Sequence, residues 1–133
     1  MYYFAYGLNL NRKQMAQCCP GSQPRFSVEL PNYKLIFTGW SRQWRGGLAS
    51  IKHSRGDKVL GGIYEIAETD LTRLDRYEGC PDNYNRLKVI VYRDSGEQIE
   101  AIIYIQSRQS EEAKASADYL KVIQQGYRDW GLI

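Results

Sequence analysis

Short apolar runs of five to nine residues recur along this chain, and polar turn residues separate them. Such runs are typical of strands. We expect strands at residues 2–6, 25–30, 33–38, 48–52, 58–66, 86–93 and 99–106. Turns at residues 31–32 and 54–57 would separate two pairs of these strands. Because the strands do not alternate strictly with helices, the pattern predicts an α+β fold, a curved or closed mixed sheet with helices packed on it.

Three segments carry helical signals. A short helix is expected within residues 9–17, with Asn9 or Asn11 as its N-cap. A second helix covers about residues 70–78, because a glycine and a proline follow where it should end. A third covers about residues 116–130, where the apolar side chains recur at helical spacing.

The composition fits a single domain that covers residues 1–133. No apolar run approaches the roughly 20 residues that a bilayer span requires, so we expect no membrane association. The three cysteines, Cys18, Cys19 and Cys80, are odd in number, which favours free thiols and a cytoplasmic location over a disulfide framework. The cysteines and the single histidine have no metal-ligand spacing, so no metal site is expected.

The net charge of +3 is unevenly distributed along the chain. Residues 1–58 hold nine Lys or Arg against two Asp or Glu, whereas the remainder is acidic. Residues 40–47 interleave tryptophan and arginine, a combination that can stack on nucleic-acid bases. The stretch is short and the second half is acidic, so we expect no nucleic-acid partner. A mobile loop near a pocket fits better, with Gly46 and Gly47 allowing a close backbone approach.

The most informative segment for chemistry is the helix that ends at Glu78. Leu71, Leu74 and Glu78 stand at i, i+3 and i+7 and share one helix face. Because the leucines should face the core, Glu78 is aimed at the protein, where burial and the helix C-terminus both raise a carboxyl pKa. Such a group suits proton transfer near neutral pH. The alternative is that Glu78 pairs with an arginine such as Arg73, Arg76 or Arg86, or extends to the surface. Asp75 borders the face and supports local hydrogen bonds.

A second candidate is the turn after the first strand, at Tyr6-Gly7-Leu8-Asn9-Leu10. A glycine followed two residues later by an asparagine suits a turn that points successive backbone N–H groups at one anion. The same residues also suit an ordinary turn at a strand end. A nucleotide loop is excluded, because neither GxGxxG nor GxxxxGK[ST] is present.

Other catalytic arrangements find little support. A serine or cysteine triad needs a positioned base, and His53, the only histidine, lies mid-strand with no implied partner. We expect the His53 side chain to face solvent. Cys18 and Cys19 are more consistent with packing at a helix end than with a reactive site.

In their order along the chain, these segments resemble the γ-glutamylcyclotransferase family. The family opens with a strand followed by Tyr-Gly-Ser-Asn-Leu, and residues 4–10 match except that Leu8 replaces the serine. The family's catalytic glutamate lies in Leu-Asp-x-x-Glu-Gly, which residues 74–79 match completely. Residues 46–49 resemble its Gly-Gly-hydrophobic-Ala strand. Three later tyrosines also match: Tyr84, Tyr104 and Tyr119.

The resemblance implies a small mixed β-barrel of about six or seven strands, flanked by two or three helices. It also implies a cofactor-free enzyme of acyltransferase or lyase type. The α-amine of a small γ-glutamyl substrate attacks its own γ-amide carbonyl, which releases 5-oxoproline and a free amine or amino acid. Glu78 would be the general acid and base. The residues that would bind the substrate are Tyr6, Gly7, Leu8, Asn9, Leu10, Tyr84, Tyr104 and Tyr119.

Three questions stay open at the level of sequence. Leu8 in place of the serine leaves the substrate undefined among γ-glutamyl amino acids, γ-glutamylamines, glutathione-like peptides and γ-glutamyl-protected intermediates. The alternative function is a non-catalytic module of the same fold that binds a small carboxylate or a partner. The oligomeric state is also open, with a homodimer as one option.

Overall fold

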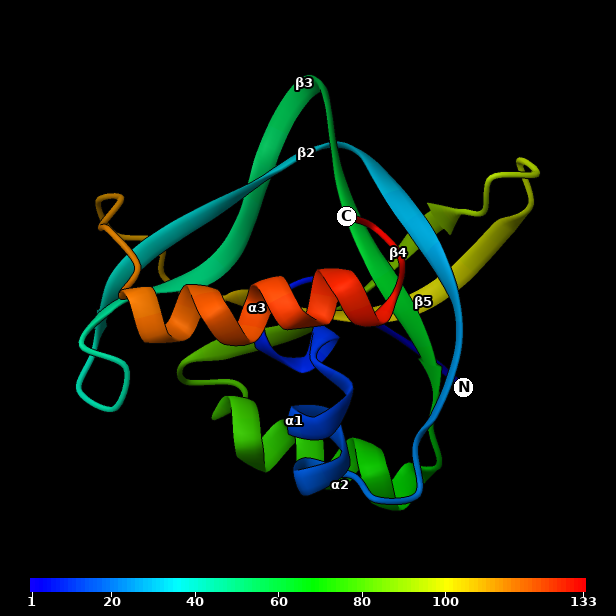
Figure 1. The fold of residues 1–133 in the computed structure, drawn as a ribbon, viewed down its shortest axis with the longest axis horizontal. Helices are drawn as coiled ribbons and strands as arrows, with labels where there is room; N and C mark the ends of the chain where they lie inside the picture. Colours follow the sequence, from blue (N-terminus) through cyan, green and yellow to red (C-terminus); the bar gives the residue numbers. More distant parts are fainter.

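Five strands form a closed barrel with three α-helices around it in the computed structural model, which describes residues 1–133 (Figure 1). The strands are β1 (Tyr2–Ala5), β2 (Gln23–Ser41), β3 (Gly46–Glu65), β4 (Tyr84–Tyr92) and β5 (Gln98–Gln106). The helices are the 3₁₀-helix η1 (Leu8–Leu10), α1 (Arg12–Cys18), α2 (Glu68–Glu78) and α3 (Ala117–Asp129). The strand order is β1-β3-β2-β4-β5, and a parallel pairing of β1 with β5 closes the barrel. The predicted small mixed barrel is confirmed.

The barrel has five strands because β2 and β3 each span two of the expected ones. The expected turn at residues 31–32 is a bulge in β2, where the pairing register shifts between Pro31 and Tyr33. Asn32 there has φ +65°, and its side-chain oxygen accepts the Gly56 N–H at 3.2 Å. The two expected turns therefore lie opposite each other in one hairpin and bend it without reversing the chain. Proline and a residue of positive φ suit a bulge as well as a turn.

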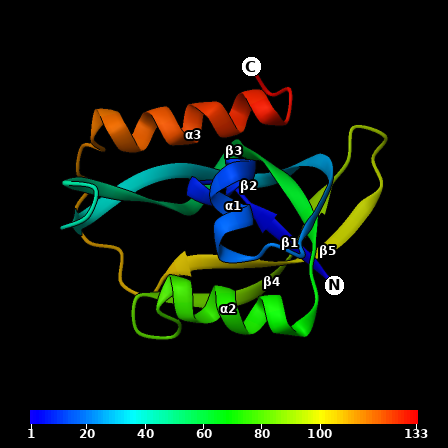
Figure 2. The same cartoon turned by 60° about the horizontal axis from the view of Figure 1, so that its bottom comes forward.

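The helices cover the barrel from two sides. Figure 2 shows α3 on one side and α2 on the other, with α1 between them. The Asn11 side chain accepts the Gln14 N–H at the start of α1, and Ser116 accepts the Tyr119 N–H at the start of α3. The expected helices are therefore present, with the first divided into η1 and α1. None of the helices is long and apolar enough to cross a membrane.

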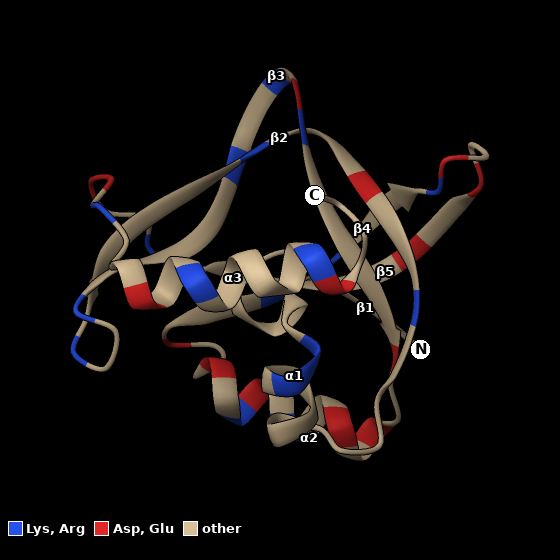
Figure 3. Cartoon of the chain, in the orientation of Figure 1, with Lys and Arg blue, Asp and Glu red and all other residues tan.

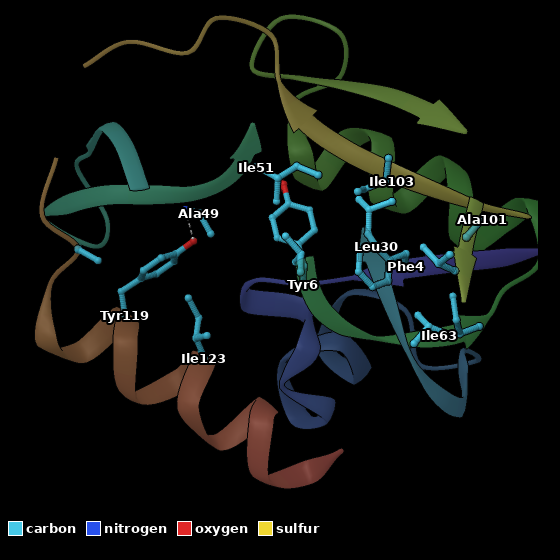
Figure 4. Packing of buried hydrophobic residues seen from close by; sticks show 14 residues of the cluster. Phe4, Tyr6, Leu30, Ala49, Ile51, Ile63, Ala101, Ile103, Tyr119 and Ile123 are labelled. Atoms are coloured by element: carbon cyan, nitrogen blue, oxygen red, sulfur yellow. Dashed lines mark hydrogen bonds between the residues drawn. The ribbon is translucent and has the colours of Figure 1, made fainter. Parts of the chain in front are cut away.

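Strand β1 separates two apolar clusters because successive side chains point to opposite faces of a strand. Phe4 and Tyr6 belong to the cluster inside the barrel, which Figure 4 shows with side chains from β2, β3, β5 and α3. Tyr3 and Ala5 belong to a second cluster, which packs α1 and α2 against the barrel wall. The chain leaves β1 between these clusters, so the turn that follows it lies where barrel and helices meet.

Candidate active site

A cavity of about 540 Å³ opens at this junction. Its wall is formed by the end of β1 and the following turn, the β2–β3 hairpin, the end of α2, the start of β4, the end of β5, and α3. Eight of the nine residues predicted to form the site line it: Tyr6, Gly7, Leu8, Asn9, Glu78, Tyr84, Tyr104 and Tyr119. The barrel thus brings together residues that are more than a hundred positions apart in the sequence.

Leu10 is the exception. Its side chain is fully buried in the cluster between the barrel and the helices and does not line the cavity. Its N–H donates to the Gly7 carbonyl at 3.1 Å, and its carbonyl accepts the Trp130 indole N–H at 2.7 Å. Both backbone groups are therefore used within the fold, and Leu10 differs from the other eight predicted residues in not lining the cavity.

Glu78 lies in the last turn of α2 and lines the cavity. Leu74, one turn earlier, is fully buried, so the predicted helix face is confirmed. None of the chain's six ion pairs includes Glu78. Arg86, one of the three arginines considered as its partner, pairs with Asp75 instead at 2.5 Å. Burial raises the pKa of Glu78 to about 7, so the side chain can hold or release a proton near neutral pH.

The hydroxyl groups of the cavity tyrosines are oriented by the barrel backbone. The Tyr84 hydroxyl donates to the Ala49 carbonyl at 2.8 Å, and the Ala49 N–H donates to the Tyr119 hydroxyl at 2.9 Å. Figure 4 shows the second of these contacts. The Tyr6 hydroxyl donates to the Tyr104 carbonyl at 2.6 Å. One residue of β3 thus positions the hydroxyl groups of two cavity tyrosines.

These tyrosines stay neutral at physiological pH. Burial raises the pKa of Tyr119 to about 12, and the nearby negative charge of Glu78 adds to the effect. Burial also raises the pKa of Tyr6 and Tyr84 well above the usual value for a phenol. Among Glu78 and these tyrosines, Glu78 is therefore the group whose charge changes near pH 7.

The Asn9 side chain has an unusual environment on the turn after β1. Its amide N–H donates to the Tyr3 hydroxyl at 3.2 Å, while its side-chain oxygen is buried without a hydrogen-bond partner. A buried acceptor without a partner is costly, and such groups concentrate at functional sites. Asn9 and Tyr3 both line the cavity beside Glu78.

Several residues that line the cavity were not predicted from the sequence. Tyr77 precedes Glu78 directly, and Tyr3 lies three residues before Tyr6. Thr38 and Gln106 come from β2 and β5 and are joined by a side-chain hydrogen bond. Alternation along β1 could have indicated Tyr3, but no local signal marks Thr38 or Gln106. Among the further lining residues that were not predicted as site residues are Trp40, Trp44 and Arg108.

The loop prediction for residues 40–47 is confirmed in its position, because this hairpin end borders the cavity. A side-chain Cβ on Gly46 would lie 2.7 Å from the Ser116 nitrogen, so the expected close approach is also observed. His53 is exposed, as expected, and lies edge-on to Tyr33. The Cys18 and Cys19 sulfur atoms are 3.2 Å apart at the end of α1, and all three cysteines are free.

The comparisons with known proteins agree with this geometry. A family model described as "Gamma-glutamyl cyclotransferase, AIG2-like" matches residues 3–127. The chain belongs to this family. The γ-glutamylcyclotransferase of Bos taurus is 33% identical over 135 residues, which cover 98% of this chain and 71% of that protein. The γ-glutamylcyclotransferase of Homo sapiens is 32% identical with the same coverage.

A solved structure described as "Gamma-glutamyl cyclotransferase" has the same fold. Its TM-score is 0.94 at 31% identity, and the match covers 99% of this chain and 80% of the other. The family and the enzyme type predicted from the motifs are thereby confirmed, and the chain is a γ-glutamyl cyclotransferase that acts on a small molecule.

Proposed function

We propose that Glu78 moves the protons in the cyclisation of a γ-glutamyl compound to 5-oxoproline. The observation that carries the proposal is a carboxyl group without an ion-pair partner in a cavity lined by several neutral tyrosines, and burial there raises its pKa to about 7. The reaction requires a group that accepts a proton from an ammonium and then returns one to a leaving nitrogen. A carboxyl group that titrates near the working pH can do both.

In the first step, the Glu78 carboxylate takes a proton from the substrate α-ammonium group, and the freed amine attacks the γ-carbonyl carbon. A carbon–nitrogen bond forms and the carbonyl oxygen becomes negatively charged. Glu78 then gives its proton to the leaving nitrogen, the carbonyl re-forms and the original amide bond breaks. The restored carboxylate takes a second proton from the ring nitrogen and passes it to the released amine, which leaves as an ammonium ion. Of the three ammonium hydrogens, the lactam nitrogen of 5-oxoproline keeps one, and the amine leaves with the other two. Since the nucleophile is part of the substrate, the protein needs chiefly to hold its folded conformer.

The groups around Glu78 supply complementary contacts for the γ-glutamyl half. In the proposed complex, the backbone N–H groups of the Gly7–Asn9 turn bind the α-carboxylate. Tyr119 accepts from Ala49, so its own proton is free to donate to a substrate oxygen. The Tyr84 hydroxyl donates its hydrogen to the Ala49 carbonyl, so its oxygen can accept a hydrogen bond from the α-ammonium group. Leu8 and Tyr104 contribute apolar walls.

The decisive experiment replaces Glu78 with glutamine and measures release of 5-oxoproline from a panel of γ-glutamyl compounds. We expect kcat to fall by about 10²- to 10⁴-fold, the usual contribution of a general acid or base. Glu68→Gln is the matched control, because Glu68 is exposed in the first turn of the same helix and lies outside the cavity. Circular dichroism of both variants shows whether the fold is intact. Full activity of a folded Glu78→Gln protein would refute the assigned role.

The proposal extends to the setting of the enzyme. Residues 1–133 would act as one domain in the cytoplasm, which suits three free cysteines. The tryptophan and arginine side chains of residues 40–47 serve the cavity in this proposal, and we expect no nucleic-acid binding. A salt titration with oligonucleotides tests this expectation.

A homodimer is a further part of the proposal. Exposed Leu87 and Ile90 on β4 offer apolar contact area, and light scattering of the purified protein tests whether it forms dimers.

A further inference from the structure

The mouth of the cavity carries an exposed aromatic wall that the proposed proton transfer does not use. Trp40, at the end of β2, lines the cavity although 71% of its surface is exposed. Trp44, four residues on, packs against the ring of Tyr119 with a centroid distance of 5.3 Å. An exposed tryptophan beside a cavity is a large apolar surface available to a ligand.

This wall is held in place by the segment that precedes α3. The Ala113 N–H donates to the Phe37 carbonyl at 2.8 Å, and the Gly47 N–H donates to the Lys114 carbonyl at 3.0 Å. Within the hairpin, the Trp44 N–H donates to the Ser41 hydroxyl at 3.1 Å. The backbone that carries both tryptophans is therefore attached at several points, and the Trp44 ring is held against Tyr119, which limits the ordering that a ligand must impose.

A cation without a partner lies at the same mouth. Arg108, just after β5, lines the cavity and takes part in none of the chain's ion pairs. Figure 3 shows further basic positions at the tip of the β2–β3 hairpin. The two carboxylates among the lining residues are Glu78 and Asp82. With Glu78 assigned to proton transfer and the Gly7–Asn9 turn to the α-carboxylate, Arg108 is available for a second carboxylate.

We propose that this mouth recognises the leaving group, and that the preferred substrates are γ-glutamyl derivatives of aromatic α-amino acids. The aromatic ring of the leaving amino acid packs on Trp40 and Trp44, and its carboxylate pairs with Arg108. A cavity of about 540 Å³ lies within the roughly 300–1,000 Å³ of sites that enclose molecules of this size. The inference rests on the proposed function, because it assigns the part of the substrate that the cyclisation expels.

Four substrates separate the aromatic contact from the carboxylate contact. γ-Glutamyl-phenylalanine has both an aromatic ring and a second carboxylate, and γ-glutamyl-ethylamine has neither. γ-Glutamyl-alanine has only the second carboxylate, and γ-glutamyl-phenethylamine has only the ring. For the unmodified enzyme we expect kcat/KM to be highest for γ-glutamyl-phenylalanine. It should fall by about tenfold for each missing contact, a typical value for one charged hydrogen bond or one stacked ring.

Two variants assign the contacts to residues. Arg108→Gln should lower kcat/KM about tenfold for the two carboxylate-bearing substrates and leave the two amine derivatives unchanged. Trp40→Ala should lower it about tenfold for the two ring-bearing substrates only, and Trp40→Phe should restore most of the loss. Arg42→Gln is the matched control, since Arg42 is exposed on the same hairpin but does not line the cavity.

The outcomes separate this inference from the proposed function. Equal kcat/KM for all four substrates, or an equal loss on all four in Arg108→Gln, would overturn the leaving-group assignment while the cyclotransferase mechanism stands. No 5-oxoproline from any γ-glutamyl compound would overturn the proposed function and this inference with it.

Discussion

Two carboxyl groups at the end of α2, three residues apart, have opposite surroundings. Asp75, towards β4 and β5, accepts the Tyr104 hydroxyl at 2.6 Å and pairs with Arg86 at 2.5 Å. Glu78, towards the cavity, has no ion pair, and burial raises its pKa to about 7. One turn of helix therefore carries a carboxylate that ties elements together and another that is left free to change its charge.

The contrast shows how the fold keeps a reactive carboxyl from being neutralised. A cation close to Glu78 would stabilise its ionised form and lower its pKa, which would weaken it as a proton acceptor. Asp75 pairs with Arg86 and accepts the Tyr104 hydroxyl, so neither group is bound to Glu78. The partnered residue thus has a positioning role, and the unpartnered one is suited to chemistry.

The largest effect that tests this contrast is pH dependence. If the Glu78 carboxylate is the base, kcat/KM should fall about tenfold per pH unit below pH 7, on a limb with its midpoint near 7. Stability should change in the opposite direction. A carboxyl whose folded pKa is raised binds its proton more tightly when folded, so the unfolding free energy should fall as pH rises from about 4.5 to 7.

The stability change from this one group is on the order of 3 kcal/mol and should level off above pH 7. Urea denaturation of the enzyme and of Glu78→Gln at several pH values measures it as the difference between the two proteins. If the unfolding free energies of the two proteins changed with pH in the same way, folding would not raise the pKa of Glu78. The contrast between Glu78 and Asp75 would then disappear.

The second largest effect is expected when Asp75, the carboxyl group with hydrogen-bond and ion-pair partners, is replaced. Asp75→Asn keeps the shape but weakens the contacts to Tyr104 and Arg86, and we expect the unfolding free energy to fall by about 1–2 kcal/mol. Activity at pH 8 should change only a few fold, because the Glu78 carboxylate is retained. Urea denaturation and a 5-oxoproline assay measure the two quantities. A loss of activity as large as that of Glu78→Gln in a folded protein would place Asp75 in the reaction itself.

Much of this contrast could be predicted from the sequence, because its causes are local. The spacing of Leu71, Leu74 and Glu78 is a property of one helix, and it correctly directed Glu78 towards the interior. The glycine turn after the first strand is equally local, and it lies in the cavity wall as expected. The order of these motifs along the chain was enough to indicate the family.

The remaining features depend on contacts between distant segments. Arg86 could have paired with either carboxyl group, and its choice depends on how β4 packs beside α2. Proline, asparagine and glycine signal a bulge and a turn alike, so the joining of four expected strands into β2 and β3 depends on Asn32 meeting Gly56 across the hairpin. Trp40 and Arg108 meet at the cavity mouth only because the barrel closes.

The smallest effect comes from Arg86 itself. The side chains of Arg86 and Asp75 are 40% and 31% exposed, so Arg86→Gln should lower the unfolding free energy by less than about 1 kcal/mol. Because the charge of Arg86 is already balanced by Asp75, the pH midpoint of kcat/KM should move by less than about 0.3 units. Lys88→Gln is the matched control, since Lys88 forms an exposed pair with Glu100 on neighbouring strands. A rise of a full unit in Arg86→Gln alone would show that Glu78 depends on the arginine, and that the two carboxyl groups share one cation.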